Sequence, residues 1–183
     1  ASRGQSFYAF FPRAWWGGFQ LGWQAETRQR VFRRLRIAHP YLVYLGGSAA
    51  FCIGIGFAFG SEALFAYAIL CGHSQVQLFL ADYVQHYGLR RVQKNERLEP
   101  VGPKHAWDAP HWFSTALLLG STQHAAHHLP GRESSREISH TTPKLPYGLP
   151  VMATLALFPS LWFRVMHPRL DAFQNVERQH EAA

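Results

Sequence analysis

Three closely spaced histidines are the strongest candidates for chemistry in the sequence. His124, His127 and His128 form an H-x-x-H-H group. On a helix, residues three or four positions apart lie on one face, with their Cβ atoms about 5–6 Å apart. Imidazoles at that separation can share one metal ion or bind two neighbouring ions, and imidazole nitrogen suits Fe, Zn, Cu or Ni. The group therefore indicates a metal site, although a chance or proton-linked cluster is an alternative in a chain with 11 histidines.

Three other histidines lie where they could support such a site. His86, in the stretch D-Y-V-Q-H-Y-G-L, follows a long apolar run. A polar side chain near a membrane-spanning helix is costly and is a functional candidate, although an interfacial histidine bonded to water or backbone explains the spacing equally well. His105 and His111 flank a tryptophan-containing turn, H-A-W-D-A-P-H. We expect these two to orient metal ligands rather than to bind metal themselves.

Two uncharged apolar segments are expected to position these histidines. Residues 41–61 and 63–81 each approach the ~20 residues that a membrane-spanning helix needs. The alternative, a pair of buried core helices, would need a much larger soluble protein around it. A polar group in the second segment is expected to make hydrogen bonds between helices. Its members are His73, Ser74, Gln75 and Gln77.

Upstream of these segments, residues 15–37 combine an aromatic stripe with an arginine-rich face. This pattern predicts a helix in the plane of the membrane interface, and an amphipathic helix of a soluble protein is the alternative. Downstream, residues 82–183 are expected to form the cytoplasmic or interfacial region that carries the metal site. Within that region, residues 145–163 are uncharged but contain Pro150 and Pro159, which favours an interfacial or re-entrant segment.

The positions of the charges give the apolar segments an orientation. The chain has 18 Lys and Arg against 11 Asp and Glu, a formal net charge of +7. Basic residues lie before residue 41 and after residue 81, whereas Glu62 is the one charged residue between the two segments. By the positive-inside rule, both flanks are cytoplasmic and residues 60–62 form the turn on the far side. Topology thereby explains the basic charge, and we do not expect nucleic acid as a partner.

Composition excludes several further classes. Aromatic residues make up 15% of the chain and charged residues 16%, which rules out a disordered protein. Two cysteines cannot form a disulfide scaffold or a cysteine-type zinc site.

We expect residues 1–183 to form a single membrane domain. Because the chain starts at Ala1 with neither an initiating Met nor a signal peptide, we also expect it to be part of a longer protein.

Several motifs, in order and at matching spacing, resemble those of the membrane-bound alkane monooxygenases, relatives of the integral-membrane desaturases and of xylene monooxygenase. The matching stretches are S-R-G-Q-S-F-Y-A-F-F-P-R (2–13), D-Y-V-Q-H-Y-G-L-R-R (82–91), H-A-W-D-A-P-H (105–111), H-A-A-H-H (124–128), P-K-L-P-Y-G-L-P-V-M (143–152) and L-W-F-R-V-M-H-P-R-L (161–170). The second is similar to the family signature N-Y-x-E-H-Y-G-L, and the fourth is similar to the third histidine box of the family. The resemblance covers nearly the whole chain and corresponds to the C-terminal half of these enzymes.

This resemblance implies an all-α integral membrane fold, the C-terminal portion of a six-transmembrane-helix, histidine-rich di-iron protein, with two spanning helices in this chain. Two non-haem iron ions would lie at the cytoplasmic side of the bacterial inner membrane. The matching ligands are His86, His124, His127 and His128, and the residues that would support them are Gln85, Asp82, His105 and Asp108. The implied reaction is terminal hydroxylation of an alkane or a similar apolar, lipid-like substrate, with dioxygen and electrons from a rubredoxin-type protein. Membrane lipids would surround the protein.

Two departures from the family pattern leave alternatives open. The first two histidine boxes of the family have no counterpart here and would lie upstream of Ala1, so we expect this chain alone to be inactive. Gln85 stands where the family has glutamate, and Ala126 stands where its third box has an acidic residue. These two substitutions support a non-catalytic pseudoenzyme. A fatty acid desaturase or a xylene-type hydroxylase of the same superfamily is the other alternative.

Overall fold

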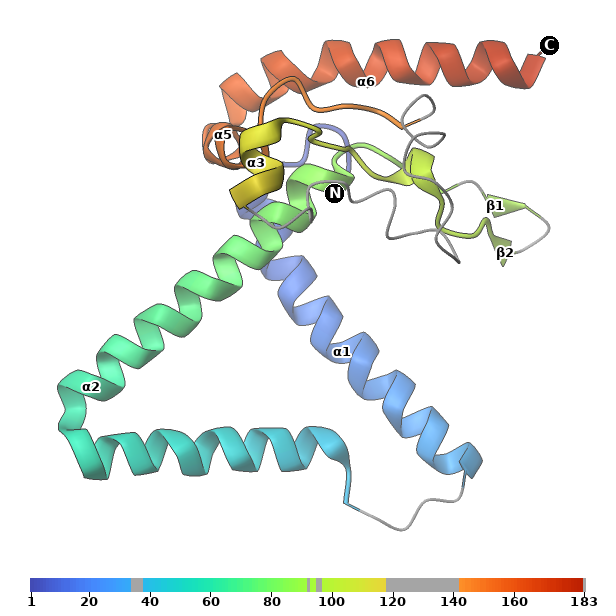
Figure 1. Cartoon of the computed structure of the whole chain (residues 1–183). Coiled ribbons are helices and arrows are strands. Elements are labelled where there is room, and N and C mark those ends of the chain that lie inside the picture. The colour runs from blue at the N-terminus through green and yellow to red at the C-terminus, as the bar shows by residue number, and fades with distance from the viewer. Residues whose placement is uncertain (34–37, 92, 95–96, 118–141, 183) are drawn as a thin grey trace. The chain divides into compact units, whose positions relative to one another are not determined.

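A computed structural model describes the chain except for residues 34–37, 92, 95–96, 118–141 and 183. The described helices are α1 (Phe7–Arg33), α2 (Pro40–His86), α3 (Trp112–Leu117), α5 (Leu149–Ala156) and α6 (Pro159–Ala182), with a 3-10 turn, η1 (Pro103–His105). Two short strands, β1 (Gln93–Lys94) and β2 (Arg97–Leu98), form an antiparallel pair. Figure 1 shows that helices dominate the described part of the chain, as predicted.

The chain divides into two compact units. We call Phe11–Phe79 the apolar unit, and we call Ala1–Phe10 together with Leu80–Ala183 the core unit. Helices α1 and α2 both pass from one unit into the other. Each unit is described below by itself.

In the apolar unit, α2 is the described helix that is long and apolar enough to cross a membrane. None of its most apolar 18-residue window is buried, and Phe57 and Phe59 are 89% and 77% exposed. The helix is interrupted at Gly60, where φ is 85° and ψ is 177°, and it bends there (Figure 1). This break falls within the predicted turn at residues 60–62. The apolar surface of α2 therefore fits a lipid environment rather than water.

Helix α1 begins at Phe7, whereas the sequence pattern predicts a start near residue 15. Ser6 explains the earlier start, because its Oγ accepts a hydrogen bond from the Ala9 N–H at 3.3 Å. A serine at this position satisfies one of the free N–H groups of the first helical turn. The helix then continues through Gly22, where an added Cβ would lie 1.9 Å from the hydroxyl oxygen of Tyr41. That glycine therefore lets α1 and the start of α2 approach closely.

The core unit is built around the end of α2 and one face of α6. Tyr83 and Tyr87 are fully buried, and their ring centroids lie 5.4 and 5.2 Å from that of the buried Trp162 on α6. The segment before α1 packs on the same core: the Tyr83 hydroxyl donates to the carbonyl of Gln5 at 2.7 Å, and Arg3 forms an ion pair with Asp171. The core unit therefore fixes the last turn of α2, which carries His86.

Residues 145–163 form the end of a loop, helix α5 and the start of α6, with the break between the two helices before Pro159. The buried residues recur every three or four positions, which is the spacing of one helix face. They are Leu149, Met152 and Ala156 on α5, and Trp162, Met166 and Leu170 on α6. An interfacial or re-entrant location for this segment stays a prediction.

Candidate metal site

His86 is the last residue of α2, and its ring is held by the backbone of a turn that follows. The Nδ1 atom of His86 lies 2.8 Å from the carbonyl oxygen of His105. A carbonyl oxygen can only accept a hydrogen bond, so Nδ1 carries a proton, and in the neutral ring Nε2 carries the lone pair. Metal-binding histidines are commonly oriented through such a carbonyl partner. The side chain of His86 is 26% exposed, and its tautomer and position fit a metal ligand.

Asp82 lies one helical turn before His86, on the same face of α2. Its Oδ1 atom is 3.7 Å from Nε2 of His86, and its side chain is 51% exposed. This distance is too long for a hydrogen bond, but it places a carboxylate beside the nitrogen that carries the lone pair. Histidine and carboxylate together form a donor set that suits non-haem iron. The structure thus brings together two of the residues that the sequence singled out.

His105 is buried, and both of its ring nitrogens have protein partners. Its Nδ1 atom accepts a hydrogen bond from the Gly102 N–H at 2.9 Å, so the proton of a neutral ring lies on Nε2. That Nε2 atom lies 2.9 Å from Oε1 of Glu99, a side chain that is 12% exposed. His105 therefore lies where a supporting residue is expected, with its ring turned to Glu99 and its carbonyl turned to His86.

Sequence reasoning missed Glu99. It lies six residues before His105 in a loop with Pro100 and Pro103, where no helical or strand period relates the two positions. A glutamate directly before the proline-containing stretch 100–103 is the one signal that could have found it. The structure also places Lys104 beside it, with Nζ 3.2 Å from Oε2 of Glu99.

Gln85 and Asp108, the other two predicted supporting residues, are both buried, at 6% and 8% exposure. The carbonyl of Gln85 accepts a hydrogen bond from the Trp107 N–H at 2.7 Å. Asp108 pairs through its backbone with the segment after the third histidine box, donating to Pro143 at 2.9 Å and accepting from Leu145 at 2.8 Å. The H-A-W-D turn is thus joined to the end of α2 on one side and to residues 143–145 on the other.

His124, His127 and His128 lie outside the described residues, so their role as metal ligands stays a prediction. Helix α3 begins at Trp112 and is described as far as Leu117. Among the described residues, no three side chains of His, Cys, Asp or Glu are grouped closely enough to hold a metal ion. His111 lies just before α3, with Nε2 3.3 Å from the carbonyl of Leu145.

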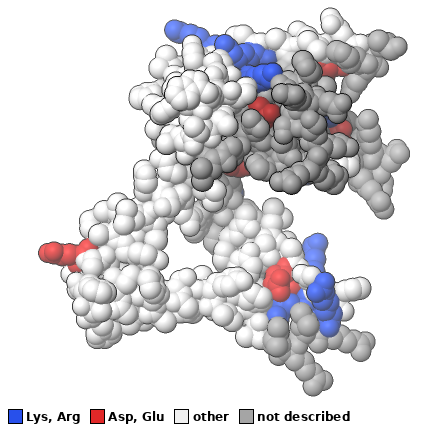
Figure 2. All heavy atoms as spheres, in the orientation of Figure 1, with Lys and Arg blue, Asp and Glu red and all other residues white. Residues whose placement is uncertain are grey.

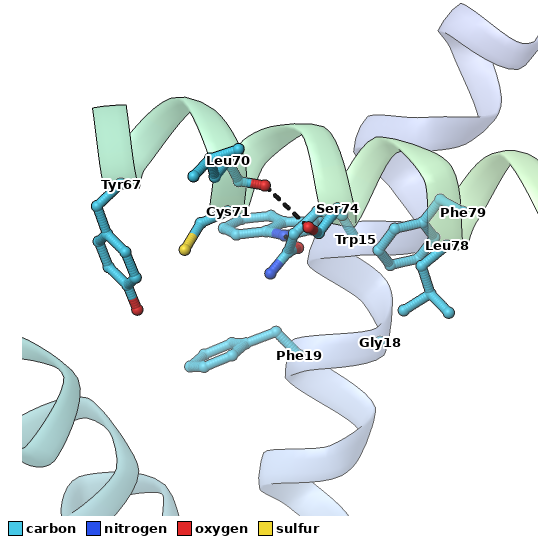
Figure 3. Close-up of a pocket in the computed structure, with 10 residues that line it drawn as sticks. Trp15, Gly18, Phe19, Tyr67, Leu70, Cys71, Ser74, Leu78 and Phe79 are labelled. Carbon is cyan, nitrogen blue, oxygen red and sulfur yellow. Dashed lines mark hydrogen bonds between the residues drawn. The ribbon is translucent and has the colours of Figure 1, made fainter. Parts of the chain in front are cut away.

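The apolar unit contains an open cleft of about 780 Å³ between α1 and α2. Figure 3 shows the side chains that line it, which are mainly aromatic and aliphatic. They are Trp15, Gly18 and Phe19 of α1, with Tyr67, Leu70, Cys71, Ser74, Gln75, Leu78 and Phe79 of α2. A cleft of this size and character suits an apolar chain.

One predicted interhelical hydrogen bond is present at this cleft. The Nε1–H of Trp15 on α1 donates to Oε1 of Gln75 on α2 at 2.6 Å, which confirms the prediction for Gln75. Ser74 instead donates to the carbonyl of Leu70, within α2, at 2.9 Å (Figure 3). His73 likewise lies 3.4 Å from Gln77 of the same helix. For these residues the bond forms within one helix, because the i and i+4 positions are adjacent.

Comparison with known proteins identifies the family. The model of the fatty acid desaturase family matches residues 1–134. The chain belongs to the fatty acid desaturase family. It is similar to alkane 1-monooxygenase 2 of Pseudomonas aeruginosa, at 31% identity over 176 residues, covering 93% of this chain and 47% of the relative. It is also similar to alkane 1-monooxygenase 2 of Alcanivorax borkumensis, at 28% identity over 179 residues, covering 94% and 47%.

A third relative is alkane 1-monooxygenase 1 of Alcanivorax borkumensis, at 34% identity over 173 residues, covering 88% of this chain and 41% of the relative. The relationship to membrane alkane monooxygenases that the motifs indicate is therefore confirmed. The chain spans about half the length of the curated relatives it matches. Family membership and the apolar helix α2 together indicate an integral membrane protein.

Proposed function

We propose that this chain is part of an alkane 1-monooxygenase, an oxidoreductase that hydroxylates the terminal carbon of an alkane with dioxygen and electrons from a rubredoxin-type protein. The observation that carries the proposal is the similarity to alkane 1-monooxygenases over 93% of the chain. The orientation of His86 at the end of α2 adds support, because its ring presents Nε2 with a lone pair.

In this proposal His86, His124, His127 and His128 hold two non-haem iron ions together with further ligands from outside residues 1–183. Bound iron would supply the activation of dioxygen. The His105 carbonyl keeps the proton of His86 on Nδ1, and the Asp82 carboxylate lies beside Nε2. The four candidate histidines are about half of what a two-iron site of this superfamily draws on, so residues 1–183 alone would be inactive.

The substrate and the electron donor are proposed from the surfaces of the chain. An alkane has no polar group, so it can only be held by shape and by apolar contact, which the cleft between α1 and α2 offers. The basic residues that flank the apolar segments would face the cytoplasm in the inner membrane, where they would attract an acidic donor such as rubredoxin. In the same arrangement residues 41–61 and 63–81 form two spanning helices.

Desaturation of an acyl chain is the second candidate, and the family match to fatty acid desaturases favours it. A pseudoenzyme is the third, and Gln85 favours it. A neutral amide is buried at that position, where a carboxylate of the family would bring a negative charge to the site.

Membranes that contain the protein expressed from its complete coding sequence, supplemented with rubredoxin and its reductase, test the proposal. Under ¹⁸O₂, we expect octane to give 1-octanol with one ¹⁸O atom, and we expect no new double bond in an acyl-chain substrate. His86→Ala should abolish the product. His73→Gln is the matched control, because His73 lies on the same helix and bonds to Gln77 within it. Iron-loaded protein that yields no alcohol would refute the monooxygenase proposal, and a new double bond would establish the desaturase.

A further inference from the structure

The carbonyl that orients His86 belongs to a short turn, which is held by contacts with the end of α2 and by contacts within its own loop. Trp107 makes the first kind of contact: its N–H donates to the Gln85 carbonyl at 2.7 Å, and its Nε1–H donates to the Tyr87 carbonyl at 2.8 Å. The second kind runs through the ring of His105, which bonds to Gly102 and Glu99 of the same loop. The His105 carbonyl belongs to the residue whose ring makes these loop contacts, so they add to the Trp107 contacts in keeping that carbonyl within reach of His86.

The ring of His105 is fixed at both nitrogens. On one side, Nδ1 accepts the Gly102 N–H at 2.9 Å, and the His105 N–H in turn donates to the Gly102 carbonyl at 3.0 Å. On the other side, Nε2–H donates to Oε1 of Glu99 at 2.9 Å. The side chains of His105 and Glu99 are 7% and 12% exposed, so little water is available to replace either partner. The ring, the turn η1 and the His105 carbonyl therefore move together.

Glu99 is held in turn by Lys104, whose Nζ lies 3.2 Å from Oε2 of Glu99. Lys104 is also 3.9 Å from Oε1 of Glu177 on α6. The two glutamates thus share one lysine, and Glu99 is the one of the two that is hydrogen-bonded to His105. This difference gives a matched pair of positions at which a carboxylate can be removed.

We propose that Glu99 is a positioning residue for His86, acting through the buried ring of His105 and its carbonyl. The proposal rests on the proposed function in one respect, that His86 is an iron ligand. Without Glu99, the Nε2–H of His105 loses its acceptor, and the ring of His105 no longer anchors the turn that carries the carbonyl. The proton of His86 then distributes between Nδ1 and Nε2, and the lone pair is no longer held on Nε2.

Iron binding by the full-length protein is the first test. We expect Glu99→Asp, which keeps the charge beside Lys104 but is one methylene too short to reach Nε2, to weaken iron binding about 10–100-fold in a competition with a chelator. Glu99→Gln keeps an acceptor oxygen and should bind iron nearly as the wild type does. Glu177→Gln is the matched control and should leave binding unchanged. In a His86→Ala background, Glu99→Asp should cause no further loss, because its effect passes through His86.

The ring of His86 gives a second readout that needs no metal. In metal-free protein labelled with ¹⁵N-histidine, we expect the ¹⁵N shifts of His86 to report the Nδ1–H tautomer in the wild type and in Glu177→Gln, and a mixture of tautomers in Glu99→Asp. Retention of that tautomer and of full iron affinity in Glu99→Asp would overturn the proposal, as would a wild-type His86 protonated at Nε2. Wild-type protein that binds iron without making alcohol would instead refute the proposed function alone.

Discussion

At the scale of single residues, Tyr87 connects three parts of the core unit through its polar atoms. Its hydroxyl oxygen accepts a hydrogen bond from the Gly4 N–H at 2.8 Å and lies 3.0 Å from Nε2 of His167 on α6. Its carbonyl accepts a hydrogen bond from Nε1–H of Trp107 at 2.8 Å. Burial raises the pKa of Tyr87, and the Gly4 N–H and the charge of Arg3 only partly oppose this. The phenol is therefore held in its neutral form.

Tyr87→Phe should lower the free energy of unfolding by about 1–3 kcal/mol, because the Gly4 N–H and the His167 ring lose their partner in a buried place. The contribution of the hydroxyl should be complete below about pH 10, where the unfolded phenol is also neutral. It should be lost as the pH rises above that value, because the unfolded phenol ionises while the pKa of folded Tyr87 is higher. Thermal melts in detergent at pH 8 and pH 10.5 measure this.

The control for this prediction is Tyr147→Phe, since Tyr147 is 51% exposed. Its melting temperature should follow that of the wild type at both values of pH. A gap between the wild type and Tyr87→Phe that stays constant from pH 8 to pH 10.5 would contradict a raised pKa for Tyr87.

The sequence predicted part of this site and missed the rest for physical reasons. His86 could be found because it follows a long apolar run, where a titratable side chain is unexpected. Its partner is a backbone carbonyl, and every residue has one, so no residue type marks it. Glu99 and His105 pair across a proline-rich loop without a period, and Tyr87 bonds to Gly4 across more than eighty positions of the chain.

At the scale of elements, the apolar runs were predictable, and the breaks between elements were predictable only where a residue type demands them. Gly60 interrupts α2 within the predicted turn, with a backbone conformation that is essentially restricted to glycine. Ser6 caps the start of α1 in the structure, whereas the predicted start at residue 15 followed the aromatic stripe alone. The strands β1 and β2 have two residues each, too few to show an alternating pattern.

Gly60→Ala should lower the stability of the apolar unit by about 1–3 kcal/mol, because an alanine at φ 85° and ψ 177° is strained. The added Cβ would have no atom within 4 Å, so backbone strain is the whole effect. Gly54→Ala is the matched control: this glycine is helical and equally open, and its replacement should be neutral or stabilise the helix by up to about 1 kcal/mol. Unfolding titrations in mixed micelles measure both, and equal stability of the two variants would show that residue 60 is not in this conformation.

At the scale of the whole molecule, charge and apolar surface are segregated. On the face shown in Figure 2, the helices of the apolar unit are almost entirely uncharged, with coloured atoms at the end of α1 and at the bend of α2. The charged residues near the end of α1 include Arg28, Arg30 and Arg33, and Glu62 follows the break at Gly60. A soluble protein rarely leaves so large an apolar surface in water. The segregation therefore supports the proposed membrane hairpin with both basic flanks on one side.

Three single-cysteine variants test that hairpin. Each is made in a background in which Cys52 and Cys71 are replaced by alanine. With a membrane-impermeant maleimide on intact cells that have a permeable outer membrane, we expect Glu62→Cys to be labelled and Arg28→Cys and Arg90→Cys to be protected. All three should react in broken cells. The reason is that the cost of translocating the arginines keeps both flanks in the cytoplasm, whereas a turn with one glutamate crosses easily. Labelling of one flank but not the other, at Arg28→Cys or at Arg90→Cys, would mean that α2 crosses the membrane once. Labelling of both flanks with Glu62→Cys protected would mean that the orientation is inverted and that His86 lies on the outer side.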